Sequence, residues 1–174
     1  MPKIIAVVGG KHSGKTTVVE HLIAELKSRN YHVATIKEMV RIPTLDKPAT
    51  ETDQYTRAGA EIIVAVPREE TVVFIKKRLN IKDILPHLAG IDYVILEGFE
   101  HERNLPKLIA GKTADETKEY FDSFAIAVSG LIMESEAEKK KAKVFQLPML
   151  NSLTQAKELA DLVEQKAKAL ANLD

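Results

Sequence analysis

Cysteine is absent from this sequence, and its 25 basic and 25 acidic side chains leave its 174 residues with no net charge. Without cysteine the chain forms neither disulfides nor thiolate metal sites, which fits a reducing compartment. A balanced charge favours neither nucleic acid nor an acidic membrane surface as a partner. No apolar run reaches membrane-spanning length, and the start of the chain leads directly into a strand-like run. We therefore expect a cytoplasmic protein with no nucleic-acid or membrane partner.

What the chain does contain is a phosphate-binding motif near its start. Residues 9–16 have the pattern G-x-x-x-x-G-K-T of a P-loop, between a strand-like and a helix-like run. Glycines let backbone N–H groups turn inward around a phosphate, Lys15 supplies a point charge, and Thr16 offers a hydroxyl to a bridging Mg²⁺. We expect the nucleotide to contact the whole loop, namely Gly9, Gly10, Lys11, His12, Ser13, Gly14, Lys15, Thr16 and Thr17.

The length and the order of apolar segments predict a single α/β domain covering residues 1–174. A chain of this length can bury one full core and is short for two. Short β-branched runs alternate with helical periodicity, which indicates a three-layer P-loop NTPase-like sheet that is mostly parallel. Residues 61–66 and 71–75 flank a turn-like Pro-Arg-Glu-Glu segment, which predicts an antiparallel β-hairpin insertion.

Several elements are expected at stated positions. Helical periodicity continues from the P-loop to about Arg29, and residues 134–143 have the composition of a solvated helix with ion pairs at i,i+4. Ser152 and Gln155 have the spacing of a capping box that opens a last helix. Strands are expected at residues 32–37, 93–96 and 124–128, with a weaker, peripheral strand at 107–110 and a short one at 144–147.

Two acids compete for the role of metal ligand at opposite ends of one apolar run. P-loop enzymes place an acid at the C-terminal end of a neighbouring strand, where it holds the water shell of Mg²⁺. Asp92 and Glu97 are five residues apart, about 16 Å along a strand at about 3.3 Å per residue, so only one lies near the phosphates. Glu97 is at the correct end. We predict Thr16 and Glu97 as metal ligands, Lys15 and Glu97 as catalytic residues, and Asp92 as a strand-start residue.

Residues 38–57 form a long stretch without clear periodicity. Asp46 and Glu51 in this stretch are further candidate ligands of Mg²⁺, and Arg41 and Arg57 are candidate cations for the γ-phosphate. A positioned arginine is worth roughly 10³ to 10⁵ in rate. Because the sequence gives no reason to expect order here, we predict slow basal hydrolysis that rises when a partner or ligand orders this stretch.

Several motifs together resemble the MobB family of molybdopterin-guanine dinucleotide biosynthesis proteins. They are the G-x-x-x-S-G-K-T-T loop, Ile36-Lys37, the segment of residues 46–60 from Asp-Lys-Pro to Ala-Gly-Ala, and Glu97-Gly98-Phe99 followed by His101-Glu102. The motifs occur in the family's order, and the likeness covers about residues 3 to 111. Three departures remove cationic groups: Glu38 replaces the usual His, Glu100 the usual Lys, and Ala49-Thr50-Glu51-Thr52 the usual Gly-Lys-Asp-Ser.

The resemblance implies a GTP-binding protein with weak Mg²⁺-dependent GTPase activity, accessory to molybdenum cofactor biosynthesis. It also implies a homodimer that acts beside the molybdopterin guanylyltransferase, with molybdopterin as a further ligand. The apolar edge expected of the hairpin at residues 61–75 favours the same dimer, because exposed sheet edges are covered in native proteins.

A P-loop kinase or another ATP-dependent enzyme acting on a small metabolite is the alternative. Such a kinase should carry a lid rich in arginine, and the arginines of this chain are scattered. The sequence has no Asn-Lys-x-Asp guanine signature, so the choice of GTP over ATP rests on the resemblance alone.

Overall fold

The computed structural model describes residues 2–39, 48–102 and 104–169. The chain divides into two compact units, one of residues 1–38 with 88–174 and a smaller one of residues 39–87. Within the described residues, no helix combines the length and the apolar character that crossing a bilayer requires. The single domain expected from the sequence stays a prediction.

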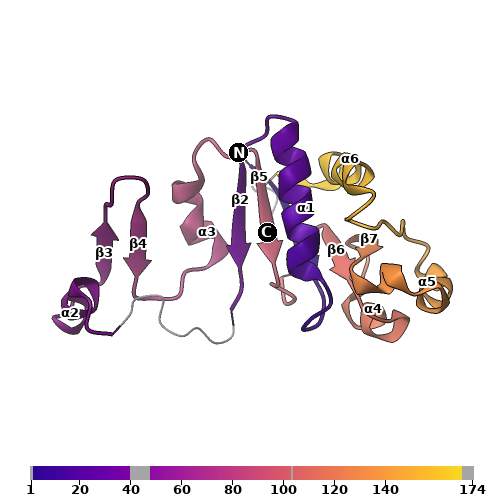
Figure 1. The fold of residues 1–174 in the computed structure, drawn as a ribbon, viewed down its shortest axis with the longest axis horizontal. Coiled ribbons are helices and arrows are strands. Elements are labelled where there is room, and N and C mark those ends of the chain that lie inside the picture. The colour runs from indigo at the N-terminus through magenta and orange to yellow at the C-terminus, as the bar shows by residue number, and fades with distance from the viewer. Residues whose placement is uncertain (1, 40–47, 103, 170–174) are drawn as a thin grey trace. The chain divides into compact units, whose positions relative to one another are not determined.

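A mostly parallel sheet forms the centre of the larger unit (Figure 1). Its strand order is β2-β5-β1-β6-β7, and all four pairings along this path are parallel. A short β8 pairs antiparallel with β1. This architecture confirms the predicted α/β fold class. The bounds are Lys3–Val8 for β1, Val33–Lys37 for β2, Tyr93–Glu97 for β5, Lys107–Ala110 for β6, Ala125–Ser129 for β7 and Lys168–Ala169 for β8.

Strand β6 corrects the prediction of a peripheral strand at residues 107–110. It lies between β1 and β7, and all four of its residues are buried. Its first residue is a lysine, and a buried ammonium is costly in an interior strand. Lys107 Nζ, however, lies 2.7 Å from Asp122 Oδ2. The carboxylate neutralises the buried ammonium, and the strand can therefore occupy an interior position.

Helices cover both faces of this sheet. On one face, α1 (Lys15–Ser28) packs beside α6 (Ala156–Lys166), as Figure 1 shows, and Leu22 and Leu159 share one apolar core with Ala127 of β7. The next residue of β7, Val128, packs instead with Ala142 of α5 (Glu136–Ala142). Successive side chains of a strand point to opposite faces, so the sheet is the middle of three layers.

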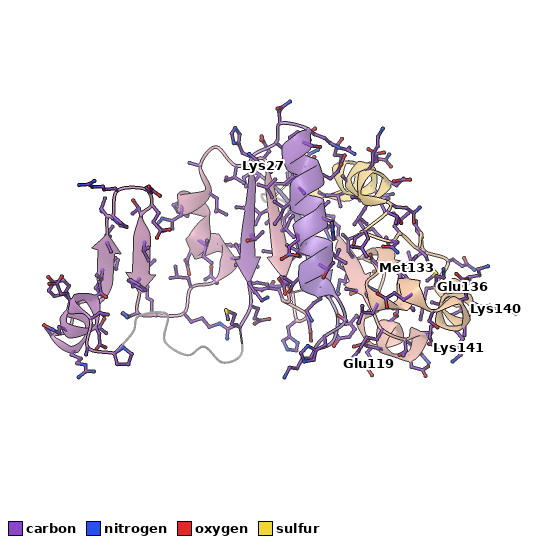
Figure 2. The ribbon with its side chains drawn as sticks, in the orientation of Figure 1. Lys27, Glu119, Met133, Glu136, Lys140 and Lys141 are labelled. Atoms are coloured by element: carbon purple, nitrogen blue, oxygen red, sulfur yellow. The ribbon has the colours of Figure 1, made fainter. Side chains whose placement is uncertain are left out.

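Helix α5 confirms the solvated helix expected near residues 134–143, with a different pairing of charges. Glu136 pairs with Lys139, and Glu138 pairs with Lys141, both at i,i+3 rather than i,i+4. Figure 2 shows the charged face of this short helix. Glu138 also accepts a hydrogen bond from the backbone N–H of Ala114, which begins α4 (Ala114–Tyr120). The bond to Ala114 positions the Glu138 side chain, and the ion pairs of this helix form between residues three apart.

Two predictions near the C-terminus are wrong. Residues 143–145 form a 3₁₀ helix instead of a strand, and an isolated bridge joins Met149 to Val128 of β7. The capping box does not form, because α6 starts after Gln155 and its N-cap has no side-chain bond. The Gln155 side chain accepts instead from the backbone N–H of Asn151, which closes the preceding turn.

The smaller unit confirms the predicted hairpin and adds a helix. Strands β3 (Ile62–Ala65) and β4 (Val72–Ile75) pair antiparallel in a two-stranded sheet of their own. Helix α2 (Glu51–Arg57) lies in the stretch expected to lack regular structure. It has no buried residue, so no apolar stripe marked it in the sequence. Helix α3 (Ile81–Ile84) and the 3₁₀ helix Leu85–Leu88 follow the hairpin, and Leu88 already belongs to the larger unit. A further 3₁₀ helix of the larger unit spans Leu131–Glu134.

Candidate functional site

The P-loop connects β1 to α1 at the C-terminal end of the sheet's central strand. Gly9 has φ of 146° and Gly14 has φ of 91°, both in regions that favour glycine. His12 also has a positive φ, of 59°. This turn aims the N-terminus of the 14-residue helix α1 at a cavity of about 500 Å³. A helix N-terminus beside an open cavity favours an anionic ligand.

The loop backbone packs directly against the ends of β6 and β7. A Cβ added to Gly9 would lie 2.0 Å from the carbonyl oxygen of Ala110, and one added to Gly130 would lie 2.5 Å from that of Ser13. The Leu131 N–H also donates to the Ser13 carbonyl oxygen over 3.1 Å. The interior position of β6 is therefore part of what holds the loop in shape.

Lys15 lies folded over the loop that precedes it. Its Nζ donates to the carbonyl oxygens of Gly9 and Gly10, each at 2.6 Å. These bonds hold the ammonium inside the curve of the loop, next to the helix N-terminus. The structure thus places a point charge where the sequence predicted one.

Thr16, Lys37 and Glu97 meet in the same cavity. Thr16 Oγ1 donates to Glu97 Oε1 over 2.9 Å, and Lys37 Nζ lies 2.8 Å from the same oxygen. Lys37 Nζ also donates to Thr16 Oγ1 over 3.3 Å. Glu97 is buried although it is charged. The two predicted metal ligands are therefore in direct contact, with a lysine bridging them.

Asp92 lies at the opposite end of β5, as predicted. Its side chain accepts from the backbone N–H of His32 over 2.7 Å, and its carbonyl oxygen accepts from Lys3 N–H over 2.8 Å. These bonds align the starts of β1, β2 and β5. In the register of the sheet, Glu97 lies between Val7 and Lys37, at the P-loop end.

The other predicted site residues have different positions. Lys11, His12, Ser13, Gly14 and Thr17 line the cavity. Glu51 lies exposed on α2 in the smaller unit, and Asp46 is outside the described residues. Roles for these two acids in metal binding stay predictions, as do roles for Arg41, also outside the described residues, and for Arg57.

The donor set fits a magnesium ion bound together with a phosphate ligand. Mg²⁺ prefers oxygen ligands and is commonly held by one or two protein oxygens, with phosphates and waters completing the shell. Thr16 and Glu97 supply two such oxygens at the mouth of the loop. Within the described parts of the chain, no cluster of three or more His, Asp or Glu side chains could hold a metal by itself. A metal here would depend on the oxygens of its ligand.

A comparison with protein families shows the family to which this chain belongs. The model of the MobB family, described as molybdopterin guanine dinucleotide synthesis protein B, matches residues 4–130. The chain belongs to the MobB family.

Relatives and solved structures agree with that assignment. A Methanocaldococcus jannaschii protein, provisionally named a molybdopterin-guanine dinucleotide biosynthesis adapter protein, is 36% identical over 118 residues, which are 65% of this chain and 49% of the relative. The adapter protein of that name from Haemophilus influenzae is 28% identical over 112 residues, 61% of each chain. The chain thus matches about half of the first relative's length and three fifths of the second's. The crystal structure of Bacillus subtilis MobB shares the fold, with a TM-score of 0.74 at 18% identity over 96% of this chain and 99% of that one.

Sequence reasoning missed the local role of Glu38. Glu38 Oε2 accepts from the backbone N–H of Phe99 over 3.0 Å. Phe99 and the preceding Gly98 both have positive φ, of 57° and 92°. The carboxylate thus stabilises the tight turn that follows Glu97. In the sequence, two predicted strands each end in a charged residue, at Ile36-Lys37-Glu38 and at Leu96-Glu97-Gly98. Parallel pairing of these strands brings their ends together, and this pairing could have indicated the contact of Glu38 with the turn after Glu97.

A second cavity of about 740 Å³ lies beside the loop that follows β5. His101 and Glu102, which the family resemblance singled out, line it with Glu100 and Glu119. Burial raises the pKa of Tyr120, another lining residue, and Glu100 adds to this effect. The acids of this cavity make it a poorer place for an anionic ligand than the lysine-lined P-loop cavity.

Proposed function

We propose that this MobB-family protein binds Mg²⁺ and GTP in the P-loop cavity, hydrolyses GTP slowly, and is accessory to molybdopterin guanine dinucleotide biosynthesis. The observation that carries the proposal is the contact of Thr16 with Glu97 in the cavity that Lys15 also lines. Lys15 would bind the phosphates, and Thr16 and Glu97 would hold the ion. The ion, when bound, would supply positive charge that counters the negative charge of the phosphates.

Slow turnover is expected from the cations that surround the cavity. Among its described lining residues the cations are lysines, Lys11, Lys15 and Lys37, and there is no arginine. Phosphoryl transfer in related sites gains roughly 10³ to 10⁵ in rate from a positioned arginine. Arg41 and Arg57 remain candidates for that role when a partner or molybdopterin is bound.

Calorimetric titration tests the proposal. We expect GTP to bind in the presence of Mg²⁺ and more weakly without it, and ATP to bind more weakly than GTP. We expect steady-state phosphate release below about one per second in the protein alone. Preferential binding of ATP with faster turnover would favour the kinase alternative.

The same two measurements on a Glu97→Gln variant distinguish metal binding from nucleotide binding. The amide keeps the shape of the side chain and removes its charge, so we expect a loss of Mg²⁺ dependence and of hydrolysis larger than the loss of metal-free affinity. Asp92→Asn is the matched control, because it changes the other acid of the same strand at the far end of β5. A larger effect at Asp92 would contradict the assignment of Glu97.

The proposal includes a molybdopterin guanylyltransferase as partner, a cytoplasmic location and a homodimer. The hairpin supports the dimer, because Ile62, Val64, Val66 and Val73 are exposed apolar side chains on or beside two short strands. Pairing with a second copy would cover them. We expect a dimeric mass by light scattering at micromolar concentration, and a Val64→Lys variant that is more monomeric. A monomeric wild-type protein would refute the dimer.

A further inference from the structure

Lys37 has a position that neither the P-loop motif nor the predicted metal ligands explain. Strands β2 and β5 are parallel and in register, so the last residue of β2, Lys37, lies directly beside Glu97. Its ammonium contacts Glu97 Oε1 at 2.8 Å and Thr16 Oγ1 at 3.3 Å. These are the two oxygens that would ligate the metal in the proposed site. A single positive charge therefore lies where a divalent ion would bind.

Burial gives this contact its physical significance. The Glu97 side chain is 9% exposed and that of Lys37 is 48% exposed. A buried carboxylate without a counter-charge is costly, because it loses most of its hydration. Lys37 supplies that charge, and its half-exposed, flexible stem lets the ammonium leave when another cation arrives.

We propose that Lys37 is a positioning residue that couples metal binding to nucleotide binding. Its ammonium holds the Thr16–Glu97 pair and excludes divalent ions while the phosphate subsite is empty. When Mg²⁺ enters together with a nucleoside triphosphate, the ammonium of Lys37 leaves Glu97 and forms an ion pair with the phosphate oxygens of the ligand. This inference rests on the proposed function and adds to it a residue outside the P-loop that senses the γ-phosphate.

Charge decides where the displaced ammonium goes. Once Glu97 ligates a divalent ion, Lys37 faces a net positive neighbour and is repelled from it. The triphosphate is the polyanion that enters the same cavity, which Lys37 also lines. Lysine is a common point-charge ligand of phosphates. The additional oxygens of a γ-phosphate make a triphosphate a better acceptor for it than a diphosphate.

The first test measures metal binding without nucleotide. Mn²⁺ is titrated into the nucleotide-free protein, and the free ion is counted by electron paramagnetic resonance. We expect Lys37→Met to bind Mn²⁺ about tenfold more tightly than wild type, because a like charge at contact distance is removed. Lys37→Arg should behave as wild type. Lys141→Met is the matched control, since it removes the lysine of another lysine–glutamate contact outside the site. Equal Mn²⁺ affinity in wild type and Lys37→Met would overturn the proposal.

The second test measures discrimination between nucleotides at saturating Mg²⁺, by calorimetry with GDP and with the β,γ-imido analogue of GTP. We expect Lys37→Met to lose about tenfold or more in affinity for the triphosphate and less for the diphosphate, the effect of one charge-assisted hydrogen bond. An equal loss for both nucleotides would overturn the γ-phosphate contact. Failure of the wild type to bind either nucleotide would overturn the proposed function, and the Mn²⁺ result would still decide whether Lys37 excludes the metal.

Discussion

Replacing Lys15 with alanine is expected to abolish tight nucleoside triphosphate binding. The ammonium is held by the carbonyl oxygens of Gly9 and Gly10, so it is already positioned to meet a phosphate in the loop. Charge-assisted hydrogen bonds contribute about 1.5 to 3 kcal/mol each, so losing those of one lysine to a polyanion should cost at least about 100-fold in affinity. Calorimetric titration with GTP and Mg²⁺ measures this loss.

Lys27→Ala provides the control for that measurement. Lys27 lies in the last turn of the same helix α1, at the end remote from the P-loop (Figure 2). Its removal changes the net charge of the protein by the same amount. We expect its affinity to be that of wild type. If Lys15→Ala bound the nucleotide as tightly as Lys27→Ala, the cavity would not be a phosphate site.

Replacing Gly9 with alanine is expected to cause the largest loss of stability. A Cβ at this position would lie 2.0 Å from the carbonyl oxygen of Ala110 in β6, and the backbone φ of 146° suits only glycine. The clash is between the backbone of Ala110, the last residue of β6, and a side chain at Gly9, which directly follows β1, and these two strands pair with each other. Backbone strain and overpacking together should lower the free energy of unfolding by about 3 kcal/mol or more. Denaturant unfolding followed by circular dichroism measures it.

Gly90→Ala separates the clash from the backbone strain. Gly90 also has a positive φ, of 81°, but a Cβ there would meet no atom within 4 Å. Only the conformational cost remains, about 1 to 2 kcal/mol. A Gly9→Ala variant no less stable than Gly90→Ala would contradict the close packing of the P-loop against β6.

Features that depend on a few consecutive residues were predictable. The P-loop is one continuous motif, and the strand and the helix around it follow from local periodicity. The hairpin was predictable because a turn-like segment separates two β-branched runs. Glu97 could be preferred over Asp92 because the length of a strand is known, so an acid at each end cannot serve the same site.

Two other local features were not predictable, because they rest on polar contacts that an apolar pattern does not show. Helix α2 buries none of its residues, so its formation rests on caps and charge pairs such as the 2.8 Å contact of Arg57 with Asp53. The capping box at Ser152 and Gln155 matched a local pattern, yet a competing bond from Asn151 N–H to Gln155 prevented it. A motif shows what a segment can form, and competing polar contacts decide which alternative it adopts.

The sequence by itself determined that this chain has a P-loop on a parallel α/β sheet, because glycine, lysine and threonine at fixed spacing act within one turn of backbone. Only the tertiary structure decided that β6 supports this loop from inside the sheet and that Lys37 bridges Thr16 and Glu97. The reason is physical. Strand order and register bring together Thr16, Lys37 and Glu97, which are far apart in the sequence. The burial of Glu97, which gives Lys37 its role, arises only when the layers of the fold pack together.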